Sequence, residues 1–192
     1  MKNEANLKRI RFLENDRLFL TPRSMVDIDE VYLLDHDREI LFLDRREYKA
    51  RTMEHYRGEF EKTLENHAFM ALSVIAKDTG AFMGTAVVFK IDQVEKTAHW
   101  GIILKRECWR QGIGTDVARL VLKYVFEDLG FRKLRSGTHS ANTASQRLQE
   151  KLGFVREGVL RQEFTVGGRV LDDMLYGMLR EEYFEKYEST GQ

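Results

Sequence analysis

Trp109-Arg110-Gln111-Gly112-Ile113-Gly114-Thr115 is the stretch of sequence that decides the fold. It lies between a predicted strand and a long amphipathic helix. Its two glycines let the backbone turn several N–H groups toward one point, because no Cβ stands in the way. The helix behind it adds free N–H groups and the positive end of its dipole. This arrangement predicts a loop that binds a pyrophosphate, although a glycine-flanked helix start also occurs without a ligand.

Two better-known phosphate loops do not match this stretch. A P-loop requires a Gly-Lys-Ser/Thr triplet, and none follows Gly114. A dinucleotide-binding fingerprint requires a third glycine where Val117 stands, together with parallel flanking strands. Neither motif fits, and a nucleotide-binding protein of another fold, which would bind ATP or NAD, stays as a further alternative.

The elements around the loop follow from hydrophobic periodicity and turn residues. One apolar stripe at helical spacing predicts a helix over residues 112–128, and it consists of Ala118, Val121, Leu122, Val125 and Leu129. Further helices are expected at 27–34, 53–65 and 142–151, and strands at 17–21, 69–76, 81–91, 97–104 and 132–138. A closing hairpin, 154–165 with 170–178, turns at Gly167-Gly168. The order predicts a mixed α/β sheet; residues 35–52 show no clear pattern.

Bulk composition describes an ordinary globular chain of 192 residues, with a polar leader at 1–15 and a single domain at 16–192. Lys plus Arg and Asp plus Glu are 31 each, so we expect no nucleic-acid partner and no attraction to anionic membranes. No apolar run approaches the roughly 20 residues of a membrane span. One cysteine, Cys108, excludes an internal disulfide and leaves little for a metal site. A cytoplasmic location is the default expectation.

The loop and several downstream motifs together resemble the GNAT superfamily of acetyltransferases over roughly residues 16–185. The family signature is Gln/Arg-x-x-Gly-x-Gly/Ala; Gly112 and Gly114 agree with it, whereas Trp109 departs from it. The later motifs look like the ribosomal-protein N-terminal acetyltransferase branch, and they are Asn142-Thr143-Ala144-Ser145, Lys151-Leu152-Gly153-Phe154, Glu157-Gly158 and Leu179-Arg180-Glu181-Glu182-Tyr183. The resemblance implies a mostly antiparallel mixed sheet with a splayed central pair of strands and flanking helices.

The resemblance also implies how acetyl-CoA is bound, with no metal. The backbone of Ile102, Ile103 and Leu104 would contact the pantetheine arm; the plainer alternative is a core strand. Amides of the loop would hold the pyrophosphate, and they belong to Arg110, Gln111, Gly112, Ile113, Gly114 and Thr115. Asn142 would contact the pantetheine or the adjoining part of the cofactor, or serve only as a helix cap.

The implied reaction is direct transfer of acetyl from acetyl-CoA to a primary amine in a ternary complex. Many relatives protonate the sulfur with a tyrosine where this chain has Gln149. Ser145 is the substitute acid that the Asn-x-x-Ser branch suggests, although a serine there often only satisfies the local backbone. Because the tyrosine is missing, a non-catalytic acyl-CoA-binding sensor or interaction module is the alternative function.

The general base is open at this stage. His99 is the first candidate, since an unperturbed pKa near 6.5 suits proton removal at neutral pH. Glu163 and Glu157 of the closing hairpin are rivals, and His139 ranks lower. A base is dispensable if the acceptor is a protein α-amino group, whose pKa lies near 7.7 to 8.0.

The acceptor is not readable from the residues. The resemblance favours a protein N-terminal amine, with a small amine nearly as well supported. Arg46 and Tyr48 are candidates for acceptor binding, while Cys108 is expected to be structural. Relatives are often dimers, so the resemblance also allows a homodimer.

Overall fold

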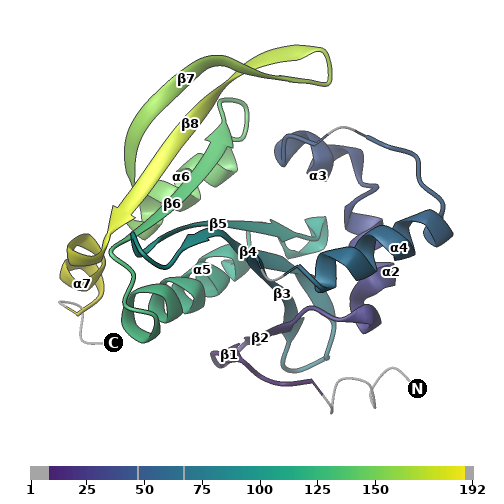
Figure 1. Cartoon of the computed structure of the whole chain (residues 1–192), viewed down its shortest axis with the longest axis horizontal. Helices are drawn as coiled ribbons and strands as arrows, with labels where there is room; N and C mark the ends of the chain where they lie inside the picture. Colours follow the sequence, from purple (N-terminus) through teal and green to yellow (C-terminus); the bar gives the residue numbers. More distant parts are fainter. Residues whose placement is uncertain (1–8, 47, 67, 189–192) are drawn as a thin grey trace.

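The structure, a computed structural model, describes residues 9–46, 48–66 and 68–188, and among them eight strands form one sheet (Figure 1). The strands are β1 (Leu13–Glu14), β2 (Leu18–Pro22), β3 (Phe69–Ala76), β4 (Phe82–Asp92), β5 (Thr97–Leu104), β6 (Lys133–His139), β7 (Val155–Val166) and β8 (Arg169–Leu179). The sheet order is β1-β2-β3-β4-β5-β6-β8-β7, and only the β5–β6 pairing is parallel. The predicted mixed, mostly antiparallel sheet is confirmed.

Helices cover both faces of this sheet. They are α2 (Ile28–Leu34), α3 (Arg38–Leu43), α4 (Met53–Leu64), α5 (Ile113–Lys123), α6 (Thr143–Leu152) and α7 (Arg180–Glu188). Short 3-10 turns stand at Met25–Asp27 and Arg106–Cys108, and a π-helical turn at Tyr124–Asp128 continues α5. The predicted helix over 112–128 is therefore α5 plus this turn, with a changed hydrogen-bond spacing at its end.

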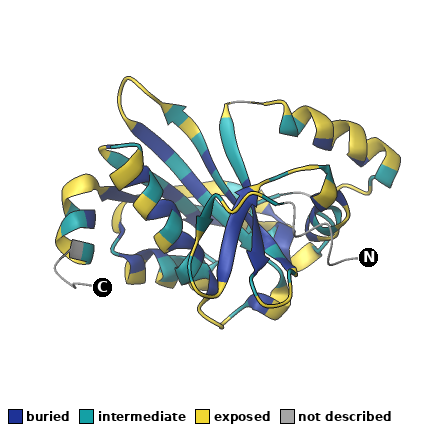
Figure 2. Ribbon diagram, turned by 90° about the horizontal axis from the view of Figure 1, so that it is seen from below, coloured by how far each residue is buried: buried dark blue, intermediate teal, exposed yellow. Residues whose placement is uncertain are grey.

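The two faces of the sheet bury separate cores, because strand side chains alternate between them. The larger core packs α5 and α6 against β2 to β6 and β8, and Trp100 is 2% exposed within it. The smaller core packs α2, α3 and α4 against residues such as Phe19 and Ile75. Figure 2 shows the central strands buried and the outer faces of the helices exposed. A ligand that contacts residues of both cores must therefore pass through the sheet from one face to the other.

The sheet opens at its centre. Strand β5 pairs with β4 along most of its length, but with β6 only at Thr97, Ala98 and His99. Beyond His99 the two parallel strands separate, while β6 continues to pair with β8 as far as His139. The predicted splay of a central strand pair is confirmed, and on that side the backbone of Gly101 to Leu104 pairs with no strand in the described part of the chain.

Several elements were not predicted. They are β1, α3, α7 and the 3-10 turns at Met25–Asp27 and Arg106–Cys108. Leu13 pairs with Leu20 across β1 and β2, and Arg9 Nη1 lies 2.6 Å from Asp27 Oδ1. The described end of the predicted leader, 1–15, is thus packed into the fold. A strand of two residues is too short to show an alternating pattern in the sequence.

Helix α3 begins at a recognisable cap: the Asp37 carboxylate accepts hydrogen bonds from the amides of Glu39 and Ile40, at 2.9 and 3.2 Å. Six residues are too few for a helical stripe to emerge. None of the helices in the described part of the chain has the length and apolar character of a transmembrane helix. The same residues hold no group of three or more His, Cys, Asp or Glu side chains placed for a metal ion.

Candidate active site

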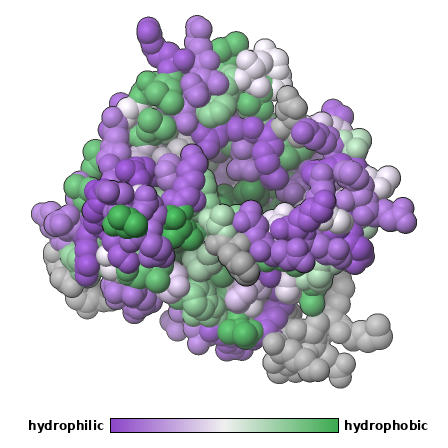
Figure 3. Space-filling model, in the orientation of Figure 1, coloured by the Kyte–Doolittle hydropathy of each residue, from purple (hydrophilic) through white to green (hydrophobic). Residues whose placement is uncertain are grey.

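A cavity of about 690 Å³ lies at the splay, between α6 and the loop on one side and α3 on the other. Figure 3 shows a hollow near the middle of this face, with hydrophobic residues at its floor and hydrophilic residues around it. Ile102 and Leu104 belong to the larger core and Ile103 to the smaller one, and all three line the cavity. The cavity therefore passes from one face of the sheet to the other.

Most of the predicted cofactor residues meet in this cavity. Those in its lining are Ile102, Ile103, Leu104, Arg110, Gly112, Gly114, Thr115 and Asn142. Two predicted residues are not in the lining: the side chain of Ile113 is buried in the core, and that of Gln111 donates a hydrogen bond to the Glu107 carbonyl. Their predicted contribution is a backbone amide, so these side-chain positions leave that prediction open.

Two residues of the loop at 109–115 have the left-handed backbone conformation that turns several amides toward one point. Gly112 precedes α5 with a φ of +81°, a left-handed conformation that favours glycine, and Arg110 has a φ of +59°. Arg17 braces the loop from outside, since its Nη1 lies 2.8 Å from Asp116 Oδ2 and its Nη2 donates to the Gln111 carbonyl at 3.1 Å. The first two amides of α5, those of Ile113 and Gly114, have no acceptor within the helix and remain available at the cavity, whereas the Thr115 amide donates to the Gly112 carbonyl at 2.9 Å.

Trp109, which departs from the family signature, acts on the strand end. Its Nε1–H donates to the Leu104 carbonyl at 2.9 Å, and its ring packs against the smaller core while also lining the cavity. This hydrogen bond occupies one acceptor of the unpaired edge and ties the loop to β5. The remaining groups of the edge, near Ile102 and Ile103, face the splay.

Helix α6 places its first turn in the cavity. Asn142 caps it: the side-chain oxygen accepts from the Ser145 amide at 3.1 Å, and Nδ2 donates to the Leu43 carbonyl at 3.1 Å. The cap expected as the plainer role of Asn142 is therefore present. The half-buried Ser145 lines the cavity, and its hydroxyl makes no hydrogen bond with the residues that the structure describes. This hydroxyl is free to donate to a substrate.

Gln149, at the position where relatives have a tyrosine, does not line the cavity. Its side chain is 3% exposed and donates through Nε2 to Ser136 Oγ at 3.0 Å, beneath β6. Two residues of α6 with hydroxyl groups, Thr143 and Ser145, line the cavity, and Ser145 lies one helical turn before Gln149.

His99, the first candidate for the base, is not brought to the cavity. Its ring lies 5.5 Å from that of Phe89. Burial, helped by Lys90 and Arg135, lowers its pKa to about 4. This pKa differs from the value near 6.5 on which its selection rested, because desolvation and two cations disfavour the imidazolium.

The other candidates for the base also lie outside the cavity lining. Glu163 is exposed on β7, and Glu157 forms an ion pair with Lys133. His139 is fully buried; its Nε2–H donates to the Phe42 carbonyl at 2.9 Å and its Nδ1 accepts from the Ala141 amide at 3.2 Å. With both ring nitrogens engaged, His139 is a structural anchor.

Helix α3 forms the roof of the cavity, and the other half of the sheet holds it there. The carbonyls of Phe42 and Leu43 accept hydrogen bonds from His139 and Asn142. Arg45 Nη1 lies 2.8 Å from Asp173 Oδ1 on β8. These contacts join residues about a hundred positions apart in the chain, so α3 bridges the two sides of the splay.

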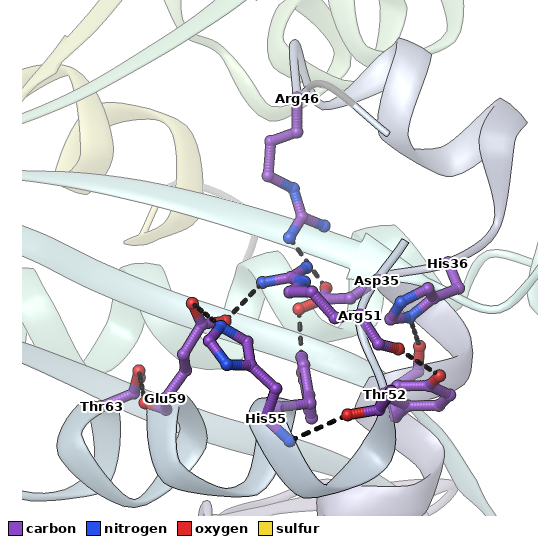
Figure 4. A network of polar contacts seen from close by, with 10 residues as sticks. Asp35, His36, Arg46, Arg51, Thr52, His55, Glu59 and Thr63 are labelled. Carbon is purple, nitrogen blue, oxygen red and sulfur yellow. Dashed lines mark hydrogen bonds and ion pairs between the residues drawn. The ribbon is translucent and has the colours of Figure 1, made fainter. Parts of the chain in front are cut away.

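A polar network stands behind this roof (Figure 4). Arg46 Nη1 lies 2.8 Å from Asp35 Oδ1, and the Tyr56 hydroxyl donates to Asp35 Oδ2 at 2.8 Å. Arg46, predicted to contact the acceptor, is therefore already paired. Tyr48, the other such candidate, is 49% exposed with Arg38 over its ring, and is not in the cavity lining.

Asp44 is a cavity residue that the sequence did not reveal. It follows α3, lines the cavity and lies 2.6 Å from Arg46 Nε through Oδ2. Desolvation raises the pKa of its carboxyl, against the opposing effect of Arg46 and Arg45. A carboxyl with a raised pKa at a cleft is a candidate proton acceptor. No sequence pattern marked it, because residues 35–52 were unassigned.

Comparison with known proteins gives the same picture of the fold. The family model described as "Acetyltransferase (GNAT) domain" matches residues 17–155. The SPbeta prophage-derived uncharacterized N-acetyltransferase YokL of Bacillus subtilis is 29% identical over 164 residues, covering 85% of this chain and 92% of the relative. The spermidine N-acetyltransferase of Vibrio cholerae, solved with CoA and spermine, superposes with a TM-score of 0.81 at 23% identity, covering 88% of this chain and 99% of that one.

Two further relatives are named for different activities. The putative ribosomal N-acetyltransferase YdaF of Bacillus subtilis is 29% identical over 104 residues, and spermidine N(1)-acetyltransferase of Escherichia coli (strain K12) is 27% identical over 113. The matches cover 54% and 59% of this chain and 57% and 61% of the relatives, less than two thirds of their lengths. The predicted affinity to the ribosomal branch is therefore not specifically favoured.

Proposed function

The chain belongs to the GNAT acetyltransferase family and is an N-acetyltransferase, and from this premise we propose that it transfers acetyl from acetyl-CoA directly to a small primary amine. The observation that carries the proposal is the cavity itself. It crosses the sheet at the splay, with the glycine loop on one side and the α3 roof on the other. Two substrates can therefore approach one point from opposite faces.

The residues present fit the cofactor. The loop around Gly112 and Gly114 offers amides at a helix start to a pyrophosphate. The unpaired edge of β5, from Ile102, offers backbone groups to the amides of a pantetheine arm. Ser145 then lies at the first turn of α6, next to the splay. A thioester held by these groups would have its sulfur within this half of the cavity.

The transfer requires three proton and charge events, and the chain offers a group for each. The amine nitrogen attacks the thioester carbonyl carbon, and the developing oxyanion would accept a hydrogen bond from a backbone N–H near Ile103 or Leu104. The C–S bond then breaks, and Ser145 would donate a proton to the leaving sulfur. Asp44 would accept the proton that the amine loses, from the roof side of the cavity.

The acceptor class follows from the relatives and from the roof. Spermidine N(1)-acetyltransferase of Escherichia coli acts, by its name, on a small amine, and this supports a small amine here. Glu39 and Asp44 supply carboxylates on the α3 side of the cavity, both held by arginines, Arg106 and Arg46. These carboxylates would orient an ammonium group before it loses its proton. A protein N-terminus is retained as an outcome of the test.

An acetyl-transfer assay against an amine panel tests the proposal. Purified protein is incubated with acetyl-CoA and each of a diamine, spermidine, an aminoglycoside, an amino acid amide and a ribosomal N-terminal peptide, and CoA release is measured. We expect turnover with a small amine, reduced at least tenfold in Asp44→Asn. CoA binding without turnover on any amine would instead favour the sensor module. Turnover on the peptide alone would overturn the proposed acceptor class.

A further inference from the structure

The cations in the cavity lining differ from the acids in one respect. The basic side chains of the lining are Arg110, Arg147 and Lys151. None of the three forms an ion pair or hydrogen bond through its side chain with the residues that the structure describes. The acids of the lining, Glu39 and Asp44, are both paired with arginines.

This contrast extends to the cations just outside the cavity. Arg17, Arg45 and Arg106 each lie within 3.0 Å of a carboxylate oxygen, and Lys105 lies 2.6 Å from Glu30. These four neighbouring cations are therefore neutralised by carboxylates, unlike the three cations of the lining. Uncompensated cations that face a cavity are available to an anionic ligand.

The three cations gather at the loop end of the cavity. Arg147 and Lys151 are four residues apart on α6, so they share one face and are separated by about 6 Å along the helix. Leu148, between them, approaches the loop: its Cδ2 would lie 3.5 Å from a Cβ placed on Gly114. Arg110 comes from the loop itself. The cluster is therefore beside the expected pyrophosphate site and toward the far end of α6 from Ser145.

Charge matching identifies what these cations would bind. The loop amides and the helix dipole suit the two charges of a pyrophosphate. CoA carries a third phosphate, a monoester on the ribose 3′-oxygen, with a charge of about −1.5 to −2 at neutral pH. A lysine and an arginine fork are the usual partners of such a group.

Resting on the proposed cofactor site, we infer that Arg147 and Lys151, together with Arg110, form a subsite for the 3′-phosphate of CoA. The subsite makes the protein discriminate CoA from 3′-dephospho-CoA. The subsite binds the phosphomonoester group alone, and it makes no contact with the pantetheine or the pyrophosphate.

Isothermal titration calorimetry with CoA and with 3′-dephospho-CoA, at low ionic strength, tests the inference. We expect the wild-type protein to bind CoA at least tenfold more tightly. The double variant Arg147→Gln/Lys151→Gln should lose most of this preference, while its affinity for 3′-dephospho-CoA changes less than about threefold. The matched control, Arg57→Gln/Lys123→Gln, removes one exposed arginine and one exposed lysine away from the cavity and should keep the wild-type ratio.

The other outcomes separate this inference from the proposed function. Equal wild-type affinity for the two ligands would overturn the subsite and leave the acetyl-CoA site standing. An equal loss of affinity for both ligands in the double variant would place these cations on the pyrophosphate and also overturn the subsite. If the wild-type protein bound neither CoA nor 3′-dephospho-CoA, both the proposed cofactor site and the subsite would be overturned. Circular dichroism and thermal unfolding of each variant establish that it is folded.

Discussion

Ser145 and Gln149 stand on one helix but have opposite surroundings. A helix turns 100° per residue, so residues four apart nearly share a face, and small differences in tilt decide which of them a cavity reaches. Here Gln149 is buried against Ser136, and Ser145 faces the cavity with a hydroxyl that makes no hydrogen bond to any residue that the structure describes. The sequence could name Ser145 as a candidate acid, but its freedom from backbone hydrogen bonding is visible only in the structure.

We predict that Ser145→Ala lowers kcat by about 10²-fold, a typical effect for loss of a general acid. The KM for acetyl-CoA should change little, because the Asn142 cap uses the backbone amide of residue 145 and survives the substitution. Steady-state kinetics on the best amine measure both values. Ser73→Ala, a buried serine of β3 outside the cavity lining, serves as control. An unchanged kcat would exclude Ser145 as the acid.

For His99, the pKa of about 4 leads to a prediction about stability. The unfolded chain binds a proton near pH 6.5 and the folded chain only near pH 4, so the unfolded state binds more protons between these values. His99 therefore lowers the free energy of unfolding as the pH falls through this window, by at most about 1.4 kcal/mol per pH unit.

Urea unfolding at pH 7 and pH 5 measures this contribution. The wild-type protein should lose more stability between the two pH values than His99→Gln, which lacks the titrating ring. Equal losses would show that the His99 pKa is not lowered. In the pH profile of kcat/KM, His99 should contribute no ionisation between pH 6 and 7.

At the scale of elements, the loop and α5 carry the strongest sequence information. The stripe from Ala118 to Val125 is observed as a buried face, because apolar residues repeated at helical spacing over about two turns predict one buried side of a helix. The closing hairpin turns at Gly167-Gly168, both with positive φ, as its sequence indicates. These elements have local causes and can be predicted.

Helix α3 and the splay have non-local causes. Six residues give α3 no periodicity, and its place depends on partners such as His139 and Asp173 far along the chain. Asp44, which follows α3, carries no signal in the sequence for the same reason. Resemblance to a family, rather than pattern, was needed to expect the splay, since single strands carry no sign of where pairing stops.

The loop offers a graded prediction. At Gly114 an added Cβ would meet Leu148 at 3.5 Å and Leu104 at 3.8 Å, both ordinary contacts, so Gly114→Ala should fold normally. Gly114→Val adds a branch that enters the cavity, and we expect the KM for acetyl-CoA to rise at least tenfold with little change in kcat, about 1.4 kcal/mol of lost binding. The ratio of the two KM values is the measurement. A KM unaffected by valine would remove the phosphate-loop assignment.

At the scale of the whole molecule, the separation of β5 and β6 beyond His99 divides the sheet into two parts. Residues from β1 to β5 and α2 to α4 form one side, and β6, α6, β7 and β8 form the other, joined by the short β5–β6 pairing and by α5. The contacts of α3 with His139, Asn142 and Asp173 close the gap on one face. A ligand in the cavity touches both sides, so its binding should couple them.

We therefore predict that CoA stabilises the whole fold. A ligand at a hundred times its Kd adds about 2.7 kcal/mol to the free energy of unfolding, which for a domain of this size corresponds to a rise in Tm on the order of 5–10 °C. Thermal unfolding with increasing CoA measures the rise, which should follow the logarithm of ligand concentration. Gly114→Val should show a much smaller rise at the same CoA concentration, because its cavity is partly filled. If instead CoA left the Tm of the wild-type protein unchanged at concentrations that saturate calorimetric binding, the ligand would bind folded and unfolded chains alike, and the cavity at the splay would not be its site.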